Sequence, residues 1–261
     1  MDLLVPTLWI GGLGLLCGAA LAIAARYFSV EEDPRIAEVE GLLPGANCGG
    51  CGFAGCADYA KAIVEQGAAT NLCMACSAEG IQQISAIMGV AAGEVIRRRA
   101  VVQCLGTHTA SKRRFDYNGL IDCASAHATA GGDKACTYGC LGYGSCVRVC
   151  PVHAITIEDG LARVNPAACI GCGKCVAACP RHLIALVPLD APVVLLCKSK
   201  AKGPDVRKQC TAGCLGCSLC ARMAPESFSM EGALAVLDYA NPPANADAII
   251  EKCPGKCIRP A

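Results

Sequence analysis

The stretch CIGCGKCVAACP, residues 169–180, decides the fold. Its first three cysteines, Cys169, Cys172 and Cys175, are spaced so that their thiolates can hold three irons of one cubane. The fourth, Cys179, stands directly before Pro180, where a ferredoxin with two clusters carries the ligand for its other cluster. The stretch therefore predicts a ferredoxin-like unit with a partner half nearby.

Cys150-Pro151 supplies that partner half. We expect one 4Fe-4S cluster (cluster II) to take Cys150, Cys169, Cys172 and Cys175, and the other (cluster I) to take Cys136, Cys140, Cys146 and Cys179. Tyr143 stands where the middle cysteine of this half is usual, and Cys136 is the expected substitute. Pairs spaced as C-x2-C also build zinc ribbons, but a Cys-Pro donated by each half to the other favours iron.

A third cysteine run spans residues 210–225 and contains Cys214, Cys217 and Cys220. Ala224 precedes Pro225 there, so the expected Cys-Pro is missing, and Cys253-Pro254 can supply the fourth ligand. We expect one cluster in this part of the chain.

An earlier set has a different spacing, C-x2-C-x4-C-x16-C, within glycine-rich sequence. Four thiolates suit one 4Fe-4S cluster, and zinc is the alternative. Its ligands would be Cys48, Cys51, Cys56 and Cys73.

Seven cysteines remain outside these sets: Cys17, Cys76, Cys104, Cys123, Cys197, Cys210 and Cys257. VVQC at 101–104 resembles VLLC at 194–197, and each is followed by a basic loop and a dense cysteine run, so the chain contains an internal repeat. Cys104 and Cys136 match Cys197 and Cys210 in this repeat. The seven remaining cysteines either include the ligands of an additional cluster or are buried, unreactive thiols.

The composition agrees with metal-stabilised domains. The chain has 261 residues, of which 23 are cysteines and 4% are aromatic, so the cores are thin and need metal. An odd number of cysteines in closely spaced runs argues against a disulfide framework. A net charge of +1 gives no global attraction to nucleic acid, and a mean hydropathy of +0.42 is too apolar for a disordered chain.

An uncharged apolar run from Leu3 to Ala25 is long enough to span a bilayer once. Only Asp2 precedes it and Arg26 follows it, which is the reverse of a secretory signal and places the rest of the chain on the cytoplasmic side. A cleaved signal or a buried core helix is the alternative. Iron–sulfur clusters also need a reducing compartment.

These patterns predict an α+β protein with a single N-terminal transmembrane helix, a small helical four-cysteine domain and ferredoxin-like βαβ-type 4Fe-4S domains. We expect short helices around 59–64 and from Ser77 to the arginines at 97–99, and strands at 154–157, 161–164, 183–187 and 234–238. The expected boundaries are 1–28 for the anchor, 29–45 for a connector, 46–99 for the four-cysteine domain, 100–190 for the two-cluster domain and 191–261 for a degenerate second domain.

Four stretches together resemble the B subunit of the Rnf electron-transport complex in its longer, clostridial-type form. They are PGANCGGCGFAGCADYAKAI (44–63), RFDYNGLIDCASA (114–126), CTYGCLGYGSCVRVCPVHAI (136–155) and CIGCGKCVAACPRHLIALVP (169–188). The resemblance covers nearly the whole chain and weakens after Ala221.

The resemblance implies a membrane complex that passes electrons between reduced ferredoxin and NAD and couples this to Na⁺ or H⁺ translocation. The B subunit would be its iron–sulfur arm at the inner (cytoplasmic) membrane, with soluble ferredoxin as donor and membrane and flavin-bearing subunits as partners. Cluster potentials near about −400 mV are then expected. The sequence has no G-x-G-x-x-G in a strand–turn–helix setting and no phosphate loop, so we expect the chain to be an electron carrier without catalytic residues.

Two other functions stay open: a polyferredoxin subunit of a hydrogenase- or formate-dehydrogenase-type complex, and a zinc-binding interaction module. Ferredoxins are typically acidic, so basic segments are candidate docking faces, with a solvated face as the alternative. The candidate segments are 97–99, 112–114 and 198–208.

Overall fold

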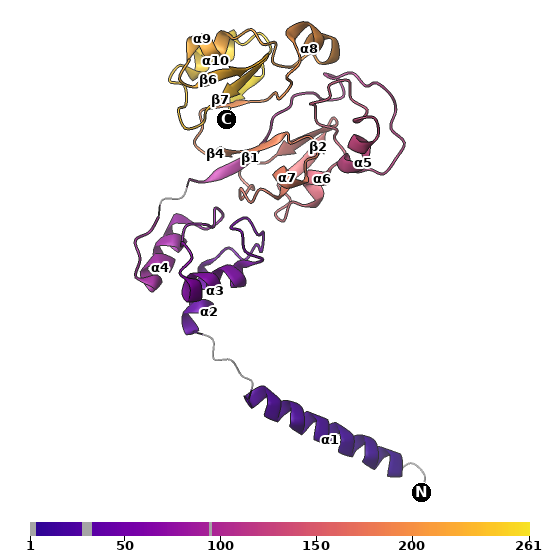
Figure 1. The fold of residues 1–261 in the computed structure, drawn as a ribbon, viewed down its shortest axis with the longest axis vertical. Helices are drawn as coiled ribbons and strands as arrows, with labels where there is room; N and C mark the ends of the chain where they lie inside the picture. Colours follow the sequence, from indigo (N-terminus) through magenta and orange to yellow (C-terminus); the bar gives the residue numbers. More distant parts are fainter. Residues whose placement is uncertain (1–3, 28–32, 94–95) are drawn as a thin grey trace.

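The computed structural model describes residues 4–27, 33–93 and 96–261. Three regions follow the first helix in chain order and lie one after another in Figure 1. We call them the N-terminal cysteine region (residues 33–93), the first repeat region (98–188) and the second repeat region (193–260).

Helix α1 (Leu4–Tyr27) carries the apolar run. From Thr7 to Tyr27 its mean hydropathy is 2.1, and this apolar segment is not buried against the rest of the chain. A helix of 24 residues is about 36 Å long, which exceeds the hydrocarbon thickness of a bilayer of about 30 Å. By length and composition α1 can therefore cross a membrane; residues 1–3 and 28 of the expected anchor lie outside the described ranges.

Three helices build the N-terminal cysteine region: α2 (Pro34–Leu42), α3 (Cys56–Gln66) and α4 (Ala78–Met88). Their apolar faces meet in one core around Val39, Tyr59 and Ile84. Tyr59 donates its hydroxyl to the carbonyl of Ala69 at 2.7 Å, which ties the following loop to α3. This region is helical, as predicted.

The expectation that the second helix runs to the arginines at 97–99 is wrong. Helix α4 ends at Met88 because Gly89 adopts the left-handed conformation (φ 65°) that stops a helix. Arg98 and Arg99 instead begin strand β1 (Arg98–Val102).

The two repeat regions share one plan, which supports the mixed helix and strand content predicted. In each, an outer antiparallel pair joins the first and last strands, and an inner hairpin lies between short helices. The first contains β1 (Arg98–Val102), α5 (Cys123–Ala128), α6 (Ser145–Arg148), β2 (Ile155–Glu158), β3 (Leu161–Val164), α7 (Lys174–Ala178) and β4 (Ile184–Pro188). The second contains β5 (Val193–Leu195), α8 (Gly203–Gln209), α9 (Leu219–Met223), β6 (Phe228–Glu231), β7 (Leu234–Leu237), α10 (Ala246–Lys252) and β8 (Ile258–Pro260).

Strands β2, β3, β4 and β7 confirm the four predicted strands to within one residue. Strand β1 pairs with β4 and β5 with β8, so each repeat closes on itself although its ends are far apart in sequence. Buried cysteines take part in both cores: Cys146 and Cys175 pack with Leu161, and Cys214 and Cys220 pack with Phe228.

Candidate iron–sulfur sites

A glycine-dependent loop places the cysteines of the N-terminal region. Asn47 adopts a positive φ of 44° and accepts the backbone N–H of Cys56 at 2.8 Å through its side-chain oxygen. A Cβ at Gly55 would lie 2.8 Å from that oxygen, so a larger residue there would displace the Asn47 side chain from its hydrogen bond. The bond fixes Cys56 at the start of α3, facing the loop that carries Cys48 and Cys51.

Two buried cysteines, Cys73 and Cys76, belong to the core against which Cys51 and Cys56 pack. Burial raises the pKa of both thiols, and the charge of Cys51 adds to the rise at Cys73 while that of Cys56 adds to the rise at Cys76. The structure thus brings Cys51, Cys56 and Cys73 into one neighbourhood, as expected, and adds Cys76 to it.

The N-terminal region touches the first repeat region at the cysteines themselves. A Cβ at Gly50 would lie 3.0 Å from the Cα of Cys172 and 3.1 Å from its carbonyl oxygen. Burial raises the pKa of Cys172, and the backbone N–H of Lys174 partly opposes this rise. The charge of Cys48 raises the pKa further. The loops of two predicted cluster sites are therefore in backbone contact.

The expected cluster II cysteines lie near one another. Burial raises the pKa of Cys175 to about 11, and the charges of Cys169, Cys172 and Cys150 add to the rise. Backbone N–H groups point at two of the sulfurs: Ala100 to Cys169 and Ala154 to Cys150, each at 3.3 Å. Such N–H···S bonds are among the protein's means of tuning a cluster potential.

The three Cys-Pro motifs form the same turn. The third residue after each cysteine has a positive φ of 46–49° and donates its backbone N–H to the cysteine carbonyl at 3.0–3.3 Å. These residues are His153, His182 and Lys256, after Cys150, Cys179 and Cys253. The turn explains why a histidine follows two of the motifs: histidine, like asparagine and aspartate, tolerates a positive φ better than most residues do.

The cavity at the expected cluster I site is lined by Cys123, Cys140, Cys146 and Cys179 and has an empty volume of about 370 Å³. Burial raises the pKa of Cys146 to about 12, and the charges of Cys140, Cys123 and Cys179 add to the rise. The structure does not bring Cys136 into this cavity; Cys136 lines a different one. Cys123 is thus a site residue that sequence reasoning left unassigned.

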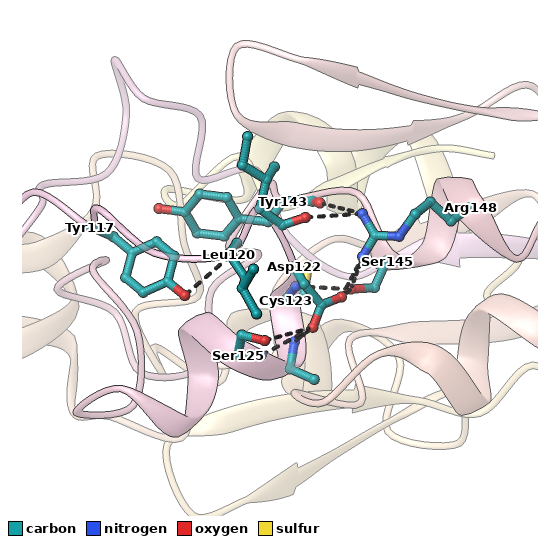
Figure 2. A network of polar contacts seen from close by, with 10 residues as sticks. Tyr117, Leu120, Asp122, Cys123, Ser125, Tyr143, Ser145 and Arg148 are labelled. Atoms are coloured by element: carbon teal, nitrogen blue, oxygen red, sulfur yellow. Dashed lines mark hydrogen bonds and ion pairs between the residues drawn. The ribbon is translucent and has the colours of Figure 1, made fainter.

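A polar network holds Cys123 in place (Figure 2). The Asp122 carboxylate caps α5 by accepting the backbone N–H groups of Ala124 and Ser125 at 2.9 and 3.1 Å. Ser145, at the start of α6, donates its hydroxyl to Asp122 at 2.6 Å and accepts the backbone N–H of Cys123 at 2.9 Å. Arg148 forms an ion pair with Asp122, which ties α5 to the helix that carries Cys146.

The electrostatic effect of the network appears in the pKa of Asp122. The hydrogen bond from Ser145 is the largest cause that lowers it to about 2, with the backbone N–H of Ser125 next. Asp122 is the N-cap of α5 and marks a helix start at Cys123, but such a signal does not identify the cysteine as a ligand.

The second repeat region has one such cavity, lined by Cys214, Cys217, Cys220, Cys253 and Cys257, with an empty volume of about 390 Å³. The expected ligands therefore come together, and a fifth cysteine joins them. The Sγ atoms of Cys253 and Cys257 lie 3.8 Å apart. Hydrogen bonds from Cys257 lower the pKa of Cys214 to about 6 and that of Cys253 to about 5, and its bonds to both raise the pKa of Cys257 itself.

The geometry of these cavities fits clusters better than single ions. Among the residues that the structure describes, no group of three or more His, Cys, Asp or Glu side chains could hold one metal ion. Structural zinc needs four ligands about 2.3 Å from one centre when they are thiolates. Here four or more cysteines line each cavity among mostly apolar residues, which suits a four-iron cubane.

Three family models match the chain. The model of the FeS family, whose description is that of an Fe-S cluster domain, matches residues 43–75. A 4Fe-4S dicluster domain matches residues 132–180, and the 4Fe-4S single cluster domain of Ferredoxin I matches residues 211–259. The chain therefore carries several iron–sulfur cluster domains, as the cysteine spacing predicted.

Similar proteins cover nearly all of the chain. It is 42% identical over 98% of its length to the B subunit of the Na(+)-translocating ferredoxin:NAD(+) oxidoreductase complex of Acetobacterium woodii, 77% of which is covered. It is 42% identical over 95% of its length to the B subunit of the ion-translocating oxidoreductase complex of Methanosarcina acetivorans, 92% of which is covered. A proton-translocating counterpart from Clostridium ljungdahlii is 40% identical, with 95% of this chain and 88% of the relative covered.

Proposed function

Because the chain belongs to the family of B subunits of Rnf-type ion-translocating oxidoreductase complexes, we propose that it is the iron–sulfur arm of such a complex, which takes electrons from reduced ferredoxin and relays them to the membrane and flavin-bearing subunits. The observation that carries the proposal is the succession of cysteine-lined sites along the molecule. The chain's own residues hold and insulate the electron carriers; 4Fe-4S clusters, when bound, supply one-electron chemistry.

The ligands that we propose for cluster I and the C-terminal cluster line two of the cavities, and those for the N-terminal cluster and cluster II are the sets expected from the spacing. They are Cys48, Cys51, Cys56 and Cys73 for the N-terminal cluster, Cys150, Cys169, Cys172 and Cys175 for cluster II, Cys123, Cys140, Cys146 and Cys179 for cluster I, and Cys214, Cys217, Cys220 and Cys253 for the C-terminal cluster. In the cluster I set Cys123 replaces the expected Cys136, because Cys123 lines this cavity and Cys136 lines a different one. Cys253 is preferred to Cys257 because it forms the turn shared by the other two Cys-Pro motifs.

The N-terminal cluster would be the one nearest the membrane. Seven residue steps separate Tyr27, at the end of α1, from Pro34, at the start of α2, so they can be at most about 25 Å apart. We propose that α1 is the single membrane span and, since Arg26 and Arg35 follow its apolar run, that the iron–sulfur regions face the cytoplasm.

The docking face for ferredoxin is best sought in the second repeat region. Arg113 lies 3.4 Å from the buried Asp133 carboxylate and Arg114 donates to the carbonyls of Ala130 and Gly132, so both are structural side chains. Lys202 and Arg207 are exposed at α8. Their charges can steer an acidic partner, and steering of this kind weakens as salt rises.

Mixing the oxygen-free, detergent-solubilised chain with reduced ferredoxin in a stopped-flow instrument tests the proposal. We expect the visible absorption of the chain's clusters to bleach as ferredoxin is oxidised, more slowly at high salt and more slowly still in the Lys202→Glu, Arg207→Glu double variant. The matched control is Lys61→Glu, on the exposed face of α3. A chain that dithionite reduces but ferredoxin does not would overturn the proposal.

The alternative, a polyferredoxin subunit of another membrane oxidoreductase, shares the clusters but not the partners. Co-purification from native membranes separates the two. Flavin-bearing membrane subunits in the purified assembly support the proposed complex, whereas a hydrogenase or formate dehydrogenase catalytic subunit would replace it with the alternative.

A further inference from the structure

Four cysteines that belong to none of the proposed ligand sets line one cavity between the two repeat regions. They are Cys104, Cys136, Cys197 and Cys210. The cavities proposed for cluster I and the C-terminal cluster are likewise lined by four and five cysteines. The cavity therefore has as many thiols as the cluster I site.

The internal repeat explains why the four cysteines meet. Cys104 follows β1 and Cys197 follows β5 by the same two residues. Cys136 and Cys210 each stand four residues before the first cysteine of their run, Cys140 or Cys214. Each repeat thus donates the same pair of cysteines, and the cavity lies where the two pairs face each other.

Backbone hydrogen bonds lock the loops around the cavity. Ser111 and Cys210 form an antiparallel bridge, in which Thr211 donates to Ala110 at 2.9 Å and Lys112 to Gln209 at 3.0 Å. On its other side, Lys112 accepts the N–H of Ala135 at 2.8 Å. The segments that carry Cys136 and Cys210 are therefore held together by main-chain bonds, which side-chain changes in the cavity leave intact.

The sulfurs receive backbone N–H groups in a symmetric pattern. Cys104 accepts from Gly106 at 3.3 Å and from Cys140 at 3.4 Å. At the matching position, burial raises the pKa of Cys197 to about 11 while backbone N–H bonds from Cys214 and Ser199 oppose the rise. These are donors of the kind that Cys169 and Cys150 receive at the proposed cluster II.

Glycines leave room next to the sulfurs. An added Cβ would lie 3.5 Å from the Cys104 sulfur at Gly106, 3.7 Å from that of Cys136 at Gly139 and 3.7 Å from that of Cys197 at Gly213. A Cβ at Gly213 would also lie 2.9 Å from Val206, which lines the same cavity. Glycines therefore stand beside three of the four sulfurs, and at Gly213 a side chain would press against Val206.

A buried cation beside the cavity needs a negative partner. Lys134 is fully buried, and its ammonium donates to the carbonyls of Gly106 and Gly160. Within the described ranges no carboxylate lies in ion-pair distance of it. A buried charge without a counter-charge is costly, and a cluster with four thiolate ligands is a dianion in its oxidised form and more negative when reduced.

We propose that Cys104, Cys136, Cys197 and Cys210 bind a further 4Fe-4S cluster at the interface of the two repeat regions. Four sulfurs around a single zinc would have to converge on one centre at about 2.3 Å, and among the described residues these four cysteines line a cavity without converging in this way. The site joins cluster I to the C-terminal cluster, because Cys104 contacts Cys140 and Cys197 contacts Cys214.

The role as a relay rests on the proposed function, whereas the metal site does not. In each transfer one electron leaves the reduced cluster on one side, which is oxidised from 1+ to 2+, and the acceptor is reduced from 2+ to 1+. No bond is made or broken and no proton is transferred. The interface site would make the succession of carriers continuous through both repeat regions.

Metal analysis of the full chain, purified in detergent without oxygen, tests the site. We expect about twenty irons and as many sulfides per wild-type chain, and about sixteen in the Cys197→Ala, Cys210→Ala double variant, with the four other clusters intact. Cys17→Ala, a change in α1, is the matched control and keeps the wild-type count.

Each result has a defined meaning. A wild-type count of about sixteen with no loss in the double variant overturns the interface cluster and leaves the four-cluster function standing. Sixteen irons with one zinc that the double variant loses also overturns it. Little iron in the wild type overturns the proposed function itself. If the double variant fails to fold, Cys210→Ser decides: an oxygen ligand changes the electron paramagnetic resonance signal of one cluster if the site exists, and an unchanged spectrum contradicts it.

Discussion

The two repeat regions have the same strands, hairpin and Cys-Pro turns, yet the first is matched by a dicluster family and the second by a single-cluster family. They differ at two ligand positions. Tyr143 in the first region stands where the second has Cys217, and Ala224 in the second stands where the first has Cys150.

We infer from this difference that a missing ligand is replaced only where another element reaches the cavity. In the first region the long loop before residue 132 brings Cys123 into the cavity that lacks a cysteine at 143, and the Asp122 network anchors it there. In the second region the later half is short and retains only Cys253 and Cys257, so no second set of ligands exists. We therefore infer that the shared strands and hairpins accept different sets of ligands, and that the loops determine the number of clusters.

The largest effect is expected from Cys123→Ala. It removes a ligand of cluster I, and we expect the chain to lose about four irons and to stop passing electrons between its N-terminal and C-terminal clusters. Iron analysis and stopped-flow reduction by ferredoxin measure the two effects.

Cys136→Ala is the matched comparison for that prediction. Because Cys136 lines the interface cavity, we expect it to cost a different set of about four irons, so that the double variant loses about eight. A double variant that loses no more than either single variant would place Cys123 and Cys136 on one cluster and return to the ligand set expected from the spacing.

A smaller effect is expected at the end of the chain. Cys253→Ala should remove the C-terminal cluster and about four irons, whereas Cys257→Ala should keep it. Since Cys257 gives hydrogen bonds to the sulfurs of Cys214 and Cys253, its loss should lower the cluster potential, because such bonds stabilise the more negative reduced state. Redox titration of the Cys257→Ala chain measures the shift. If Cys257→Ala loses iron and Cys253→Ala retains it, Cys257 rather than Cys253 is the ligand of the C-terminal cluster.

A partial effect is expected from Asp122→Ala. The change removes the cap of α5 and the bridge to α6 but leaves all four cysteines of cluster I, so we expect the cluster to form and to be lost faster to a chelator than in the wild type. Glu158→Ala, on the exposed hairpin between β2 and β3, is the control. Equal rates of iron loss in both variants would show that the network does not hold Cys123.

The same network predicts how the chelator resistance of cluster I depends on pH. The pKa of Asp122 is lowered to about 2 in the folded chain, from a usual value of about 3.9. Its contribution is therefore complete above pH 4 or so and is lost only as the pH falls toward 2. We expect the difference between wild type and Asp122→Ala in chelator resistance to be constant from neutral pH down to about pH 5.

The sequence predicts those features that follow from regular local spacing. It does not predict those that depend on contacts between residues distant in the chain. The run at 169–180, the hairpins and the apolar helix α1 follow from local spacing and period, which a single sequence displays. Cys123 could not be separated from Cys136 in this way, since both lie upstream of Cys140 and the choice depends on how the intervening loop folds. Likewise, the pairing of Cys104 with Cys197 needs two repeats that lie against each other.

The smallest effect is expected from Ala224→Cys, which restores the Cys-Pro that the second repeat region lacks. Ala224 is partly buried and packs against the region's core, so a thiol fits there with little strain. In the first region the corresponding Cys150 serves a cluster whose other ligands come from the following half, and that half of the second region contains no such run. We therefore expect unchanged iron, an unchanged electron paramagnetic resonance spectrum and one additional thiol that alkylates after unfolding. A gain of about four irons would mean that Cys257 and neighbouring side chains can complete a site, and that the framework rather than the loops sets the number of clusters.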